Sequence, residues 1–164
     1  MKRMLPLVLL MGSAAQAHQA VPPPAPQRLD AAAAQAIVSG CVARSTARNQ
    51  SHAIVVVDTG GHIVAALRMD GNGHGIFDFA AVKARAVAAW GFATAGMQEA
   101  ARGTAGFADA PHVVTVPGGV PVFAADGRTR LGAVGVSGEA PPDDVACAEA
   151  GIAAAGLRAT PAPR

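Results

Sequence analysis

The sequence predicts an α+β domain in which a five-stranded antiparallel sheet is covered by helices. Three observations support this fold class. Apolar residues at helical spacing alternate with short β-branched runs, glycine and proline pairs separate the runs, and most connections between runs are short enough for hairpins. The predicted order is a helix, two strands, a long helix, a shorter helix, three strands and a final helix.

The N-terminal part of the domain contributes the first helix and a hairpin. Asp30 is a good N-cap for a helix over 31–48, whose apolar positions recur at helical spacing. The β-branched run 53–58 predicts a buried strand. A Thr-Gly-Gly turn then returns the chain into a second strand over 62–69, so the two strands are predicted to pair antiparallel.

The second half of the domain is predicted to hold three helices and three strands. A glycine-dense loop over 70–75 precedes the first of these helices, and Pro141-Pro142 opens the last, which has acidic residues in its first turn. The first helix is predicted over 76–93, a shorter one follows it and ends at 102, and the last is predicted over 143–155. The strands are predicted over 112–116, 120–124 and 131–137.

The first 17 residues have the pattern of a cleavable secretory signal. Lys2 and Arg3 precede a short apolar run, which ends in small residues and an Ala15-Gln16-Ala17 cleavage site. The run is too short to cross a bilayer, which needs ~20 residues. We therefore expect a periplasmic or secreted protein that does not contact the membrane after signal cleavage. The alternatives are an uncleaved anchor and a cytoplasmic N-terminal helix.

The signal also decides how the charge is interpreted. The chain has 13 Lys+Arg and 11 Asp+Glu, and removal of Lys2 and Arg3 with the signal leaves 11 of each. With no basic cluster and only five Phe and one Trp, nothing indicates nucleic-acid binding. Beyond the signal at 1–17, we expect a proline-rich leader at 18–27, the domain at 28–157 and a flexible tail at 158–164.

Two cysteines, Cys41 and Cys147, lie in predicted helices near opposite ends of the domain. An oxidising compartment permits a disulfide between them, provided that the two helices pack side by side. Two buried free thiols that act as small apolar side chains are the alternative. The sequence leaves both possibilities open.

Several segments, taken in order, resemble the GlcG/HbpS-like haem-binding family over nearly the whole mature domain. The resemblance implies a profilin-like α/β/α fold, homo-oligomers from dimers to octamers, and binding of a small-molecule ligand, which is haem in some members. The segments that carry it are Val55-Val-Val-Asp58 with Gly60-Gly61, Arg68-Met69-Asp70-Gly71, Lys83-Ala84, Pro117-Gly-Gly-Val-Pro-Val122, Leu131-Gly-Ala-Val-Gly-Val-Ser-Gly138, and later Asp144 and Ala150-Gly151.

The same segments supply the candidate ligand-binding residues. Arg68 offers a rigid set of donors for a carboxylate such as a haem propionate, and Lys83 adds a second cation if its side of the helix faces inward. The alternatives are a surface ion pair between Arg68 and Asp70, a solvated Lys83 and ordinary glycine turns. The full set is Arg68, Asp70, Gly71, His74, Lys83, His112, Pro117, Gly118, Gly119 and Ser137.

Haem often needs an axial ligand, and two histidines are the preferred candidates. His74 and His112 each flank one of the glycine-containing loops. No Cys-x-x-Cys-His motif is present, so covalent attachment of the c type is excluded. Ligation by another residue type, or by none, also fits the resemblance.

The sequence thus predicts an exported small-ligand-binding protein with haem as a non-covalent cofactor. One alternative is a small organic-acid-binding accessory protein of an exported dehydrogenase pathway. Another is an enzyme that uses the same pocket. No nucleophile elbow, P-loop, zinc signature or dinucleotide fingerprint is present, so catalysis is not predicted.

Overall fold

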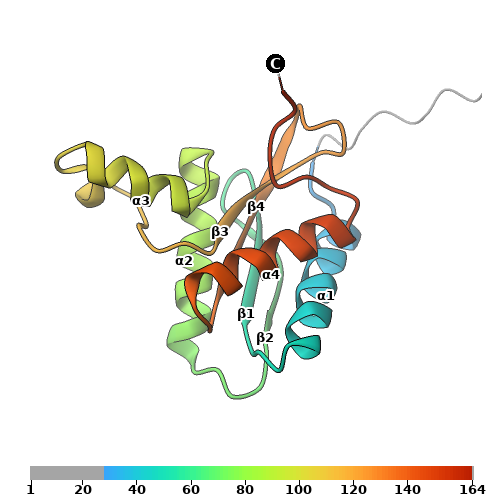
Figure 1. Ribbon diagram of the computed structural model, residues 1–164. Helices are drawn as coiled ribbons and strands as arrows, with labels where there is room; N and C mark the ends of the chain where they lie inside the picture. Colours follow the sequence, from blue (N-terminus) through green and yellow to red (C-terminus); the bar gives the residue numbers. More distant parts are fainter. Residues whose placement is uncertain (1–27, 164) are drawn as a thin grey trace, which may run out of the picture.

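Helices lie on both faces of one antiparallel sheet (Figure 1). The computed structural model describes residues 28–163, so the predicted signal (1–17) and leader (18–27) lie outside the described residues. The strands are β1 (Ala53–Asp58), β2 (Ile63–Arg68), β3 (Gly119–Phe123) and β4 (Arg130–Ser137). The helices are α1 (Ala31–Ala47), α2 (His74–Trp90), α3 (Thr94–Gly103), α4 (Pro141–Ala154) and a short 3-10 helix, η1 (Phe107–Asp109).

The sheet has the order β2-β1-β4-β3, and each neighbouring pair is antiparallel. β1 is central, and its alternating side chains enter two cores because successive residues of a strand point to opposite faces. Ile54 and Val56 pack with α1 and α4 on one face, whereas Val55 and Val57 pack with α2 on the other. The three layers are those of the predicted α/β/α arrangement.

α1 and α4 pack closely against each other. The predicted N-cap is confirmed, because the Asp30 carboxylate accepts a hydrogen bond from the Ala33 N–H (2.7 Å). On α4, Gly151 lies directly against the backbone of Ile37, where a Cβ atom would collide with the carbonyl group. This close approach brings the two cysteines together, and a disulfide joins Cys41 to Cys147.

The sheet has four strands and not the five that the sequence predicts. The segment expected as a strand over 112–116 is a loop instead. Its first residue, His112, has a φ of 62°, in the left-handed region, so the chain turns there and is not extended. Val114 packs with Met97 and Ala86 in a small separate core. Only Val114 of this β-branched run is buried, and it is buried against helices and not in the sheet.

Residues 158–163, expected as a flexible tail, contact the end of β3 and the turn that follows it. Arg158 forms an isolated antiparallel bridge with Phe123, and the Ala162 N–H donates to the Gly127 carbonyl oxygen (2.9 Å). In the described part of the chain, no helix combines the length and the apolar character needed to cross a bilayer.

Candidate functional site

The surface of the described domain includes three clefts that are candidate binding sites. The His112 cleft (≈ 280 Å³) is lined by Thr59, Gly60, Gly61, Arg85, Ala88, Ala89 and His112. The Arg68 cleft (≈ 410 Å³) is lined by Ser51, Leu67, Arg68, Met69 and Asp70. The C-terminal cleft (≈ 330 Å³) is largely apolar and is lined by Gly91, Phe92, Ala93, Val120, Pro121, Phe123, Glu149, Ala159, Thr160 and Pro161. The first two clefts carry the polar chemistry.

The His112 cleft is built from the β1–β2 turn and the second half of α2. The Asp58 carboxylate organises the turn by accepting hydrogen bonds from the backbone N–H groups of Gly60 (2.9 Å) and His62 (3.0 Å). These bonds, the one from His62 above all, lower the pKa of Asp58. Arg85 on α2 reaches the same turn through a long Nε–H contact to the Gly61 carbonyl oxygen (3.4 Å).

His112 reaches this cleft on a loop that is held from behind by an aromatic pair. The indole N–H of Trp90 donates to the Pro111 carbonyl oxygen (3.0 Å), and Trp90 packs edge-on against Phe107. The left-handed backbone at His112 is held by this anchored loop, and its side chain is exposed. The cleft therefore presents an imidazole and a guanidinium beside the small apolar side chains of α2.

The Arg68 cleft lies at the other end of β2, on a loop with a dense hydrogen-bond network. The Arg68 guanidinium donates to the Asn72 carbonyl oxygen. The Ser51 hydroxyl donates to the Asp70 carbonyl oxygen (2.6 Å) and accepts from the side-chain amide of Asn72 (2.7 Å). Gly71 makes the loop possible with a φ of 86°. The Arg68 and Asp70 side chains are both exposed.

Lys83 lies in the interior and not in a cleft. Its ammonium group pairs with the Asp144 carboxylate (2.9 Å) and donates to the Val136 carbonyl oxygen (2.9 Å), and it lies 4.8 Å from the centre of the Phe79 ring. The Lys83 and Asp144 side chains are only 1% and 2% exposed. Gly118, with a φ of 129°, passes so close that a Cβ atom there would collide with the ammonium group. The Lys83 charge is therefore neutralised inside the protein.

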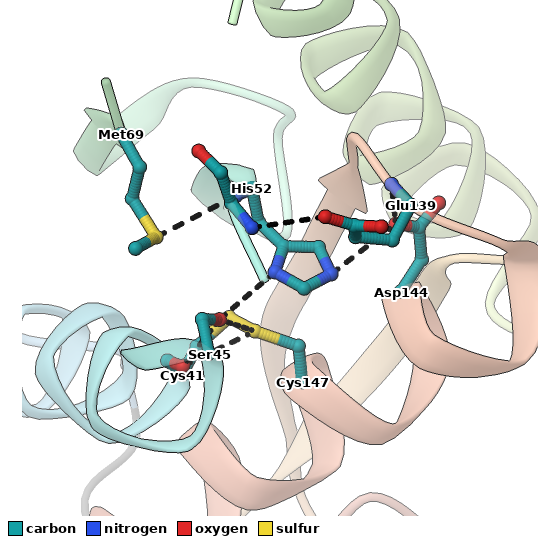
Figure 2. The surroundings of a disulfide bond; sticks show 8 residues. Cys41, Ser45, His52, Met69, Glu139, Asp144 and Cys147 are labelled. Atoms are coloured by element: carbon teal, nitrogen blue, oxygen red, sulfur yellow. Dashed lines mark hydrogen bonds and ion pairs between the residues drawn. A yellow bond between two sulfur atoms is a disulfide. The ribbon is translucent and has the colours of Figure 1, made fainter. Parts of the chain in front are cut away.

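His52 extends this buried cluster toward the disulfide (Figure 2). Its Nδ1 lies 2.8 Å from the Ser45 hydroxyl, and its Nε2 lies 3.6 Å from the Asp144 carboxylate. The Ser45 hydroxyl also donates to the Cys41 carbonyl oxygen (2.8 Å) and contacts Cys147 Sγ (3.1 Å). The imidazole is fully buried, and among the described residues its Nε2 has no hydrogen-bond partner.

Burial sets the charge state of the cluster. It lowers the pKa of His52, although the nearby Asp144 carboxylate opposes this shift. It also raises the pKa of Asp144, although Lys83 opposes that shift by hydrogen bonding and by charge. At neutral pH the lowered pKa therefore keeps the His52 imidazole uncharged beside the Lys83–Asp144 contact.

The structure separates the predicted site residues and does not bring them into one site. Arg68 and Asp70 line one cleft, with Gly71 next to it, and His112 lines another. His74 is exposed at the start of α2 and belongs to none of the three clefts. Pro117 is half-buried, and the remaining residues are buried beside the ion pair or at the ends of β3 and β4, namely Lys83, Gly118, Gly119 and Ser137.

The two candidate axial ligands lie far apart. Ala88, which lines the His112 cleft, is 14 residues beyond His74 on α2, or ~21 Å along the helix axis at ~1.5 Å per residue. Sequence reasoning missed Arg85, and it missed Ser45 and His52 in the buried cluster. These residues are brought to their partners only by tertiary packing, so no local pattern marks them.

Comparison with known proteins identifies the family. The family model described as "Haem degrading protein HbpS-like" matches residues 29–153. The chain belongs to this HbpS-like family. Protein GlcG of Escherichia coli strain K12 is 37% identical over 105 residues, which are 63% of this chain and 77% of GlcG. The range 29–153 of the family model includes both polar clefts and the buried cluster.

Solved structures share the HbpS-like fold. The crystal structure of PduOC in complex with heme matches with a TM-score of 0.72 and 23% identity, covering 81% of this chain and 99% of PduOC. A double mutant of HbpS from Streptomyces reticuli matches with a TM-score of 0.70 and 24% identity, covering 90% of this chain and 97% of HbpS. At 23% and 24% identity, these similarities establish the shared fold.

Proposed function

We propose that this HbpS-like protein binds haem non-covalently in the His112 cleft. The observation that carries the proposal is the convergence of His112 and Arg85 on one cleft. Iron porphyrins are often held by an axial imidazole, and their propionates pair well with guanidinium groups. Membership of the HbpS-like family and the heme complex of the related PduOC fold support the same ligand.

The residue types that line the His112 cleft match the chemical groups of haem. The His112 imidazole would coordinate the iron, Arg85 would pair with a propionate, and Ala88 and Ala89 would contact the flat ring. The cleft volume of ≈ 280 Å³ is just below the usual ~300–1,000 Å³ of small-molecule sites, so the macrocycle would extend beyond the cleft edge. Bound haem would supply iron redox chemistry, while the protein residues hold and orient it.

We further infer that the protein works outside the cytoplasm, as a homo-oligomer that senses, scavenges or carries haem. The basic, apolar and Ala-x-Ala pattern of residues 1–17 supports export. N-terminal sequencing of the mature chain tests the cleavage, and the mass of the haem-loaded protein in solution tests the assembly. A chain that keeps Met1 would contradict the cleavage.

Hemin titration of the protein without residues 1–17 tests the haem proposal. We expect a saturable, sharpened Soret band that His112→Ala weakens and shifts, and a lower affinity in Arg85→Gln because a charge-assisted hydrogen bond is lost. His74→Ala and Arg128→Gln are matched controls, since both side chains are exposed and lie outside the three clefts. Unsaturable binding would reject the function. Loss of the Soret band in His74→Ala alone would reject the site.

A further inference from the structure

We propose that the Arg68 cleft is a second binding site, separate from the His112 cleft, for a small zwitterion with the head group of an α-amino acid. In this assignment Arg68 takes the carboxylate of the ligand and Asp70 takes its ammonium group. Both side chains line the same cleft of ≈ 410 Å³, which is within the usual size range of small-molecule sites, ~300–1,000 Å³.

The two charges of this cleft are not used within the protein. Arg68 and Asp70 are two residues apart, but no ion pair joins them, and within residues 28–163 neither forms an ion pair with another side chain. The Arg68 guanidinium donates one hydrogen bond to the Asn72 carbonyl oxygen and keeps its other N–H groups for a ligand. A zwitterion satisfies both charges at once, whereas a plain acid or a plain amine satisfies only one.

The cleft is held in shape before a ligand arrives. The Ser51 hydroxyl is hydrogen-bonded to the backbone carbonyl oxygen of Asp70 and to the side-chain amide of Asn72. The Ser51 N–H donates to the Glu139 carboxylate (3.0 Å). Asn72 is itself buried, and Gly138 passes so close to its side chain that a Cβ atom would crowd the amide oxygen. A loop that is already ordered loses less conformational entropy when a ligand binds. It also presents the Arg68 and Asp70 charges on a fixed backbone, which favours ligands whose own charges are spaced to match.

The remaining lining residues define the rest of the ligand. Leu67 and Met69 give the cleft an apolar wall. Met69 is fixed to the neighbouring chain because its N–H donates to the His52 carbonyl oxygen (3.0 Å) and its sulfur accepts from the His52 N–H (3.5 Å). This wall favours an aliphatic side chain, so we take L-leucine as the probe.

Calorimetric titration with three related compounds tests the assignment. L-Leucine has both charges, 2-hydroxy-4-methylpentanoate lacks the ammonium group, and 3-methylbutylamine lacks the carboxylate. We expect saturable binding of L-leucine and at least about tenfold weaker binding of each analogue, because each loses a charge-assisted interaction. Equal or tighter binding of either analogue, or no saturation by L-leucine at millimolar concentration, would overturn the proposal.

Variants separate this site from the haem site. Arg68→Gln and Asp70→Asn should each weaken L-leucine binding at least about tenfold. Arg128→Gln and Asp78→Asn, which change exposed charges outside the cleft, should leave it unchanged. Hemin titrations of Arg68→Gln and Asp70→Asn should match the parent protein, so failure of one proposal leaves the other standing. Unchanged L-leucine binding in both cleft variants, with circular dichroism confirming their fold, would overturn the assignment.

Discussion

The buried cluster and the two polar clefts use similar side chains in opposite ways. In the interior, Lys83 and Asp144 neutralise each other, and His52 is held neutral beside them. At the surface, Arg68 and Asp70 share a cleft without forming an ion pair. An unpaired charge costs several kcal/mol in the interior but little in water, so pairing is enforced only inside. Interior residues are therefore expected to determine stability, and cleft residues to determine binding.

The largest stability effect is expected at the disulfide that borders the buried cluster. Cys41 and Cys147 are 106 residues apart and fully buried. Closing a loop of this length stabilises a protein by ~4–5 kcal/mol on the chain-entropy model. The Cys41→Ala/Cys147→Ala variant should therefore lose about that free energy of unfolding in urea denaturation.

Reduction of the parent protein provides the control for this substitution. Unfolding in a dithiol reductant removes the cross-link but keeps both sulfur atoms, so it separates loop closure from lost side-chain packing. The reduced parent should account for most of the loss seen in the double variant. If the reduced and oxidised parents have the same urea midpoint, the disulfide does not stabilise the fold.

The next largest effect is expected at the ion pair. Lys83→Met leaves the buried Asp144 carboxylate without its cation, which typically costs ~3–5 kcal/mol. Lys83→Met/Asp144→Leu removes both charges and should recover most of that loss, because a buried pair is often no more stable than apolar side chains of similar volume. Urea unfolding of the two variants measures the difference.

Exposed arginines provide the contrast with the ion pair. Arg68→Gln should change the free energy of unfolding by no more than ~0.5 kcal/mol, as is usual for surface substitutions. A Lys83→Met variant as stable as Arg68→Gln would contradict the division between interior and surface.

The elements with strong local signals were predicted correctly. The β-branched run of β1 and the Asp30 cap of α1 are each decided by neighbouring residues. The 112–116 segment has an equally apolar local pattern, but Val113 and Val114 pack against α2 and α3, and this choice depends on residues far away in the sequence. The error in strand number thus comes from tertiary packing that overrides a local propensity.

The candidate sites also differ in whether neighbouring residues or long-range packing forms them. Arg68 and Asp70 share a cleft because they are neighbours at the end of one strand, and the sequence placed them together. His112 meets Arg85 only after α2 and the loop before β3 have packed. The Ser45–His52–Asp144 cluster joins residues up to 99 positions apart and has no sequence signature. Long-range contacts between isolated polar residues therefore remain the least predictable part of the molecule.

The smallest expected effect is on the pH dependence of stability, which should differ between the buried His52 and the exposed His112. Burial holds the pKa of His52 below its ordinary value of 6.5. Below pH 6.5 the unfolded chain gains a proton at this position that the folded protein resists, so stability falls as the pH is lowered through this range. The slope is at most ~1.4 kcal/mol per pH unit for one proton. The raised pKa of Asp144 has the opposite sign and offsets part of the loss as the pH approaches 3.8.

Urea unfolding of the parent, His52→Gln and His112→Gln between pH 7.5 and pH 5 tests this effect. His52→Gln should flatten the pH dependence, whatever its stability at pH 7.5, because the buried group that resists protonation is gone. His112→Gln should keep the parent slope, since it leaves the buried His52 in place. A parent slope that survives in His52→Gln and disappears in His112→Gln would place the proton-sensitive group in the cleft and reverse the contrast between the two regions.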